Sequence, residues 1–290
     1  MKWINRSDSQ ANYEDRRGRG MKRGAAFGGV GMIIVAIIAL LLGKNPFQAI
    51  DMVNSVVPGQ TSEEVVDQSR INENEDLKVF TLGVFNSAND VWTELFKKQM
   101  GESYRPPTLV TFTDATSSGC GHASSAVGPF YCPADEKVYI DLNFFHQLIR
   151  DYGARGEMAI AYVTAHEVGH HVQKLLGIMD QVNQYRGRIS EAEFNRLMVK
   201  LELQADFFAG LWANQAQRMN TILIEDGDLE SAISATTAVG DDTLQKQAMG
   251  YTVPDSFTHG TAAQRTAWYK KGFLTGDVRQ GDTFNDPSLR

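Results

Sequence analysis

The hydrophobic positions along the chain divide it into an apolar N-terminal run, a polar stretch and a longer body. Residues 24–43 form a run of 20 residues without a charged side chain. At about 1.5 Å per residue, a helix of that length is about 30 Å long, which matches the hydrocarbon core of a bilayer. The pattern therefore predicts a single N-terminal transmembrane helix over residues 24–43.

The charges that flank this run predict its orientation. Residues 1–23 carry seven basic and three acidic side chains, a net charge of +4, whereas only Lys44 closely follows the run. The positive-inside rule then places residues 1–23 in the cytoplasm as a disordered basic tail, and the body outside the cytoplasmic membrane, which is the periplasm in a Gram-negative host. A cleaved signal peptide is the alternative, but the run is long for one and no A-x-A-like cleavage site follows it.

The remaining sequence predicts a linker over residues 44–75 and one domain over residues 76–290. Helical periodicity runs over residues 77–100, whereas residues 109–112 and 137–142 read as strands. Two long helices follow, and Ser190 and Glu193 form a capping box at the start of the second. The predicted helices cover residues 157–176, 190–219, 228–239 and 261–272. Strands precede long helices, so the predicted class is α+β, mainly helical with a small sheet.

Charge and cysteine content narrow the range of functions. The whole chain has a net charge of −7, so the part after residue 23 has −11. An acidic body lacks the basic surface that nucleic-acid binding requires, which excludes that class. Cys120 and Cys132 are the only cysteines, and outside the cytoplasm such a pair predicts a disulfide. A zinc site of Cys120, His122 and Cys132 is the alternative, although it lacks an evident fourth ligand.

The sequence A-H-E-V-G-H-H at residues 165–171 carries the candidate chemistry. His166 and His170 are four residues apart on a predicted helix, so both imidazoles lie on one face and can bind one Zn²⁺ ion. Glu167 lies next to His166 without being a ligand, where it can act as the general base towards water. The alternative is a helix with two structural histidines.

A third ligand is expected from the sequence L-E-L-Q-A-D at residues 201–206. Glu202 and Asp206 are also four residues apart, on a helix that is apolar almost all round, and buried carboxylates need partners. Glu202 is the predicted third zinc ligand, and Asp206 is predicted to accept the ring N–H of a ligating histidine. The reverse assignment, with Asp206 as the ligand, stays open.

These motifs give the chain a resemblance over nearly its full length. The apolar run, GCGHASSAVGPFYCP, KVYIDLNFF, TAHEVGHHVQ, LELQAD and FTHGTAAQR make it similar to the YpfJ-like family of neutral zinc metallopeptidases. The resemblance implies a zincin fold, one Zn²⁺ ion per chain, ligand roles for His166 and His170, and a base role for Glu167. The chain is also more distantly similar to gluzincins, in which a distal His or Tyr stabilises the oxyanion. His259 is the candidate for that role here, and Tyr251 a weaker one.

The sequence therefore predicts a membrane-anchored zinc metallopeptidase that hydrolyses peptides or proteins of the cell envelope. The strand at residues 137–142 is expected at a sheet edge, where it could pair with an extended substrate, although an ordinary sheet strand explains it equally well. The competing functions are a catalytically silent, zinc-stabilised binding module and a structural envelope protein without metal.

Overall fold

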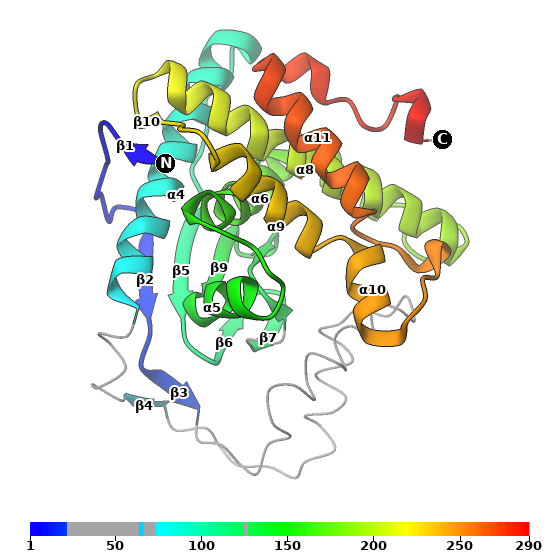
Figure 1. Ribbon diagram of the computed structural model, residues 1–290, viewed down its shortest axis with the longest axis horizontal. Coiled ribbons are helices and arrows are strands. Elements are labelled where there is room, and N and C mark those ends of the chain that lie inside the picture. Colours follow the sequence, from blue (N-terminus) through cyan, green and yellow to red (C-terminus); the bar gives the residue numbers. More distant parts are fainter. Residues whose placement is uncertain (22–63, 67–73, 125–126, 290) are drawn as a thin grey trace.

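The protein folds into a small central sheet covered by long helices, as the computed structural model shows for residues 1–21, 64–66, 74–124 and 127–289 (Figure 1). The predicted α+β class, mainly helical with small sheets, is confirmed. The long helices are α4 (Glu75–Leu95), α6 (Glu157–Leu175), α8 (Glu191–Arg218), α9 (Asp228–Ala238) and α11 (Ala262–Thr275). Each of them lies within a few residues of a helix that the periodicity predicted.

The main sheet has four strands in the order β2, β5, β9 and β8. Strand β5 (Thr108–Phe112) is parallel to both β2 (Tyr13–Arg16) and β9 (Lys137–Asp141), and β8 (Phe130–Cys132) is antiparallel to β9. Strand β9 thus has a hydrogen-bonded neighbour on each side. The expectation of an edge strand at residues 137–142 is wrong, because the main-chain groups of β9 already serve the sheet.

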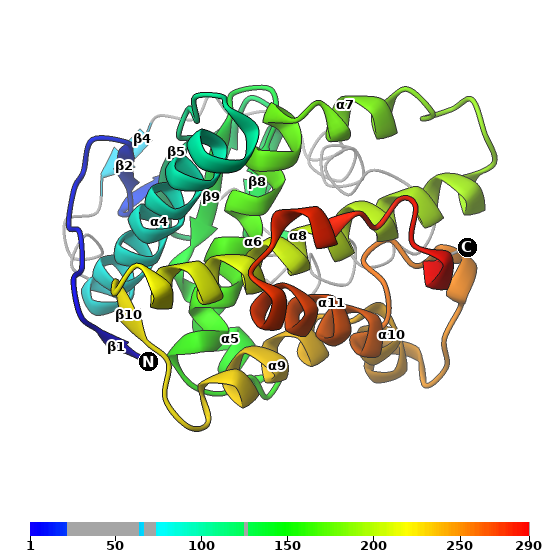
Figure 2. The same ribbon diagram turned by 90° about the horizontal axis from the view of Figure 1, so that it is seen from above.

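Helix α6 lies at the centre of the molecule, between the sheet and α8 (Figure 2). It contacts β8, β9, α4, α8 and α9. Nearly all of its residues are therefore buried, from Met158 to Gln173. Helix α8 begins with the predicted capping box, in which the Ser190 hydroxyl accepts from Glu193 N while Glu193 accepts from Ser190 N.

Helices α8 and α11 pack unusually closely, and two glycines permit it. A Cβ atom built at Gly210 would lie 2.0 Å from the carbonyl oxygen of Tyr269, and one at Gly272 would lie 2.0 Å from that of Phe207. Only hydrogen fits at both positions, so the two backbones approach each other directly. This contact brings the start of α11 against the middle of α8, where Glu202 and Asp206 lie.

Several short helices and strands were not predicted from the sequence. Helix α5 (Leu142–Arg150) follows β9 without a break, because Asp141 ends the strand and caps the helix by accepting from Asn143 N. The remaining short elements are α7 (Ile178–Asn183), α10 (Asp241–Met249), a π-helical turn (Phe96–Met100), the 3₁₀ turns Pro254–Ser256, Val278–Gly281 and Pro287–Leu289, and the strand pairs β1 (Lys2–Trp3) with β10 (Ile222–Leu223), β3 (Arg19–Met21) with β4 (Glu64–Val66), and β6 (Ala115–Ser118) with β7 (Gly121–Ser124).

The N-terminal residues are not a disordered tail. Strand β2 joins the main sheet, the Tyr13 hydroxyl lies 2.7 Å from Thr111 Oγ1, and Lys2 Nζ lies 2.6 Å from a carboxylate oxygen of Glu225. The prediction failed because the strand is four residues long and mostly charged, and its charges pair with groups of the body. Strand β2 is therefore part of the same folded unit as β5, and these residues are not separate from the body.

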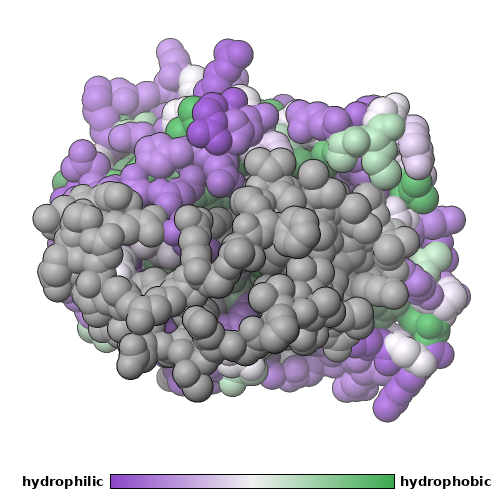
Figure 3. All heavy atoms as spheres, turned by 90° about the horizontal axis from the view of Figure 1, so that it is seen from below, coloured by the Kyte–Doolittle hydropathy of each residue, from purple (hydrophilic) through white to green (hydrophobic). Residues whose placement is uncertain are grey.

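The predicted transmembrane helix at residues 24–43 lies outside the described residues. Among the residues that are described, no helix combines the length and the apolar character needed to cross a bilayer. Hydrophilic side chains dominate the described part of the face in Figure 3. In the expected linker, residues 64–66 form β4 and Glu75 begins α4, while most of the rest is not described.

Candidate metal centre

Helix α6 presents two of the predicted metal ligands on one face. The imidazole rings of His166 and His170 have their centroids 4.8 Å apart, as expected for residues separated by slightly more than one helical turn. Both side chains are buried, as is Glu167 between them in sequence. The apolar helix around them excludes most water from this face.

Helix α8 brings Glu202 to the same point. His166 Nε2 lies 3.2 Å from Glu202 Oε2, and His170 Nε2 lies 3.5 Å from Glu202 Oε1. Each residue offers one ligand atom, and these atoms lie within 4.8 Å of one another. In a tetrahedral site with bonds of about 2.0 to 2.1 Å, neighbouring ligand atoms are about 3.3 Å apart. The two nitrogen atoms and one carboxylate therefore fit a zinc ion, with a fourth position left for water.

Asp206 lies behind His166 rather than among the ligand atoms. Its Oδ1 is 2.9 Å from His166 Nδ1, which is close enough for an ion pair. The ring N–H, however, is not aligned for a hydrogen bond to this oxygen. Asp206 also accepts from Arg265 Nε at 2.8 Å, from Arg265 Nη2 at 2.9 Å and from the Tyr162 hydroxyl. These partners occupy both carboxylate oxygens, so the geometry favours Glu202 over Asp206 as the group that faces a metal.

The charges of the centre shift the pKa values of its groups. Burial alone would raise the pKa of the Asp206 carboxyl, but the Arg265 guanidinium, together with His166, holds it below its ordinary value. For His166, burial opposes protonation, yet Asp206 and Glu202 prevail and raise the pKa to about 10. Because the proton and a metal ion compete for the imidazole nitrogen, acid should release the metal.

Burial raises the pKa of the Glu167 carboxyl above its ordinary range, and His170 and His166 only partly oppose this effect. A carboxylate that is a stronger base than usual is better matched to proton transfer near neutral pH. The predicted base thus lies in an environment that increases its basicity.

His259 lies in the loop before α11. Its Nδ1 is 3.2 Å from Asp241 Oδ1, and Asp241 Oδ2 accepts from the backbone N–H groups of Thr258, His259 and Gly260. Gly260 in turn packs against Val199 and Leu203 of α8, on either side of Glu202 in sequence. Partial burial disfavours the charged ring, but Asp241 and Glu202 raise the pKa of His259 above its ordinary value.

The other predicted residues lie elsewhere. Cys120 and Cys132 form a disulfide with a Cα–Cα distance of 5.8 Å, which rules out the alternative zinc site at these thiols. The neighbouring His171, which is not a predicted ligand, is buried with Nδ1 3.0 Å from the Tyr131 hydroxyl and Nε2 2.6 Å from Arg105 O. The weaker candidate Tyr251 is exposed.

Sequence reasoning missed four polar residues that support the predicted ones. Tyr162 and Arg265 hold Asp206, Asp241 holds the His259 loop, and Gln173 Oε1 lies 2.9 Å from His170 Nδ1. Gln173 could have been found, because it follows His170 by three residues on the same helical face. The others come from distant segments, and nothing local in the sequence pairs them.

Comparison with known proteins agrees with this geometry. The model of a family described as "Putative neutral zinc metallopeptidase" matches residues 1–284. YpfJ of Escherichia coli (strain K12) is 44% identical over 294 residues, which cover 98% of this chain and 99% of YpfJ. A protein of Mycobacterium tuberculosis (strain ATCC 25618 / H37Rv) is 38% identical over 265 residues, 87% of this chain and 86% of that protein. Neither relative's name states an activity. No solved structure matches the chain. With nearly its whole length matched and its two-histidine, one-glutamate cluster in place, the chain belongs to the neutral zinc metallopeptidase family.

Proposed function

We propose that the protein hydrolyses peptide bonds with one zinc ion held by His166, His170 and Glu202. The observation that carries this proposal is the convergence of both Nε2 atoms on the Glu202 carboxylate, with the buried Glu167 beside them. The donor set of two imidazoles and one carboxylate is typical of catalytic zinc sites, which keep one position open.

A zinc ion bound there supplies a Lewis acid that polarises the scissile carbonyl and makes water acidic enough to lose a proton near neutral pH. Glu167 takes that proton from the attacking water and later delivers it to the leaving amine nitrogen. Asp206 orients the His166 ring from its Nδ1 side, and Arg265 keeps Asp206 ionised in a buried position.

His259 is proposed to stabilise the oxyanion that develops on the scissile carbonyl. Asp241 engages its Nδ1, so Nε2 is the atom available to donate to the substrate. Asp241 also raises the pKa of His259, which favours a ring that carries the proton it needs as a donor. A preorganised donor of this kind contributes about 3 to 4 kcal/mol to transition-state stabilisation.

The proposed substrates are peptides or proteins of the cell envelope, because the Cys120–Cys132 disulfide fits an extracytoplasmic, oxidising compartment. Attachment to the cytoplasmic membrane through residues 24–43 is proposed from the apolar sequence alone, and the pairing of β2 with β5 requires that this attachment leave residues 13–16 on the same side as the body.

Bound-metal analysis of the purified full chain tests this function. We expect about one zinc ion per wild-type chain, loss of zinc with His166→Ala and with Glu202→Ala, and only weakened binding with Asp206→Ala. Hydrolysis of a quenched fluorescent peptide library should then fall about 10²- to 10⁴-fold with Glu167→Gln, while that variant keeps its zinc. A folded wild-type chain that takes up no zinc after supplementation would contradict the proposal.

The second candidate is a zinc-stabilised binding module without catalysis. It shares the metal cluster but gives no reason for a buried carboxyl at Glu167, whose burial is unfavourable when the group is ionised. Zinc binding without peptide hydrolysis, and with no difference between wild type and Glu167→Gln in the library assay, would favour this module.

A further inference from the structure

We propose that Gln173 and Gln204 are positioning residues that fix the tautomer of His170 so that its Nε2 lone pair faces the metal. The inference rests on the proposed function, and it concerns the residues that hold the His170 ring in place. His166 has Asp206 at its Nδ1. Among the described residues, the group at Nδ1 of His170 is not a carboxylate but Gln173 Oε1, at 2.9 Å.

The two glutamines form a hydrogen-bonded pair between α6 and α8. Gln173 Nε2 donates to Leu201 O at 2.7 Å and to Gln204 Oε1 at 3.1 Å, and Gln204 Nε2 donates to Gly281 O at 2.9 Å. Gln173 is fully buried and Gln204 is nearly so, with 5% of its surface exposed. Polar groups this deep are held by their hydrogen bonds rather than by water.

The direction of this chain of hydrogen bonds follows from its ends. Leu201 O and Gly281 O are backbone carbonyl oxygens, which can only accept, so each must face the amide nitrogen of a glutamine. Gln204 therefore presents its oxygen to Gln173, and Gln173 presents its oxygen to His170. An amide oxygen cannot donate, so His170 Nδ1 must carry the proton.

This assignment determines what the other ring nitrogen can do. A neutral imidazole with its proton on Nδ1 has a lone pair on Nε2, the atom that lies 3.5 Å from Glu202. An apolar side chain at position 173 would leave the ring free to take the other tautomer, which has no lone pair facing the metal. Partners of ligating histidines typically contribute about 10- to 100-fold to metal affinity.

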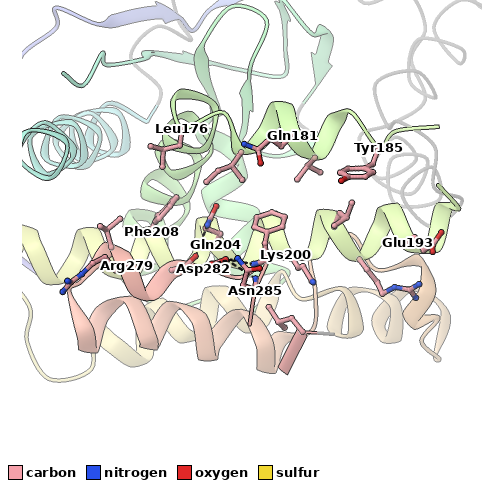
Figure 4. A pocket seen from close by; sticks show the side chains of 18 of the residues that line it. Leu176, Gln181, Tyr185, Glu193, Lys200, Gln204, Phe208, Arg279, Asp282 and Asn285 are labelled. Carbon is pink, nitrogen blue, oxygen red and sulfur yellow. Dashed lines mark hydrogen bonds between the residues drawn. The ribbon is translucent and has the colours of Figure 1, made fainter. Parts of the chain in front are cut away.

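The pair also links the metal centre to the C-terminal segment. Gly281 ends the 3₁₀ turn Val278–Gly281, and Gln204 forms part of the wall of a cavity of about 850 Å³ between α7, α8 and that segment (Figure 4). Lys200, Gln204 and Phe208 line this cavity at four-residue spacing. Glu202, on the same helix, faces α6 and not this cavity. The hydrogen bonds that run from Gly281 through Gln204 and Gln173 therefore connect the C-terminal segment to His170.

Zinc affinity and thermal stability of the full chain, measured together, test the proposal. Gln173→Met removes the acceptor, and we expect a loss of zinc affinity of about 10- to 100-fold in competition with a chelator. Gln173→Glu keeps an acceptor for Nδ1–H but loses both donors, so we expect a lower Tm with zinc affinity close to wild type. Gln245→Met is the matched control, because Gln245 is a buried glutamine bonded to Val253 N and Ser256 Oγ, away from the ligands.

A purely structural role predicts that zinc affinity follows Tm in all three variants, and that result would overturn the proposal, as would wild-type affinity in Gln173→Met. Nitrogen NMR of ¹⁵N-histidine-labelled, metal-free wild type gives an independent measurement that needs no variant to fold. At a pH where the ring is neutral, the proton should be on Nδ1 of His170, and a proton on Nε2 would overturn the proposal. Absence of zinc from the wild type would refute the proposed function but leave this tautomer measurement valid.

Discussion

At the scale of single residues, the buried carboxyl of Glu167 affects both the proposed catalysis and the stability of the fold. Its burial raises its pKa, and the unfolded chain would hold the same group in water with an ordinary value near 4.5. Between these two pKa values the folded chain binds more protons than the unfolded chain, so stability falls as pH rises. Above the folded pKa the full cost of ionising the buried group is present. The base therefore weakens the metal-free fold at neutral pH.

Glu167→Gln should consequently stabilise the metal-free protein at neutral pH, because the amide keeps the shape of the side chain without its charge. The gain should shrink as the pH is lowered and vanish below about 4.5, where Glu167 is protonated in both states. Thermal unfolding of chelator-treated full chain at a series of pH values measures this. Glu102→Gln, at an exposed position, is the control and should change nothing. A Glu167→Gln variant less stable than wild type at pH 7 would show that the buried carboxylate is a net stabilising group.

The metal-centre residues that could be predicted from the sequence are those that lie about one helical turn from another member of the centre. His166 with His170, and Glu202 with Asp206, are four apart, and helix geometry alone places each pair on one face. Arg265 contacts Asp206 across 59 positions. No periodicity encodes such a contact, which depends on how α11 crosses α8, so its role could only come from the packed structure.

At the scale of secondary-structure elements, long helices were predictable and short ones were not. Helix α8 has a capping box and 28 residues over which an apolar pattern can repeat. Helix α10 has nine residues and only two buried positions, so its sequence carries little periodic signal. Strand β9 was found by its alternation, but its place inside the sheet was missed, because strand order depends on β2 and β8, which have four and three residues.

The close contact of α8 with α11 makes a specific prediction about Gly210. An added methyl group in Gly210→Ala would meet the Tyr269 backbone at 2.0 Å, and backbone cannot move aside as a side chain can. We expect a loss of at least about 1 to 3 kcal/mol in the free energy of unfolding, the usual cost of overpacking. Chemical denaturation of the full chain measures it.

Gly83→Ala in the middle of α4 is the matched control for that substitution. The nearest atoms to a Cβ there belong to the Arg6 and Trp3 side chains, the first of which is flexible. These side chains must shift slightly, which costs stability, but alanine is about 1 kcal/mol more favourable than glycine within a helix, so this variant should stay within about 1 kcal/mol of wild type. Equal stability of Gly210→Ala and Gly83→Ala would show that α8 and α11 are not in direct backbone contact.

At the scale of the whole molecule, the N-terminal residues and the body form one structure. The sequence suggested two parts separated by a membrane, because residues 1–23 are basic and the remainder is acidic. The same charge difference instead favours contact between them, as in the ion pair of Lys2 with Glu225 and the placement of β2 beside β5. The match of the family to residues 1–284 likewise includes the N-terminal strands.

This arrangement predicts where the two ends of the chain lie when the full protein is expressed in cells. Because β2 is hydrogen-bonded to β5, a tag placed before Met1 and a tag placed after Arg290 should both be on the side of the membrane that holds the body. Protease accessibility of each tag in intact spheroplasts and in lysed ones measures this, with a known cytoplasmic protein as the control for leakage. A single crossing at residues 24–43 instead places the tags on opposite sides. That outcome would mean that β2 does not pair with β5 in the cell, and would restore the arrangement expected from charge alone.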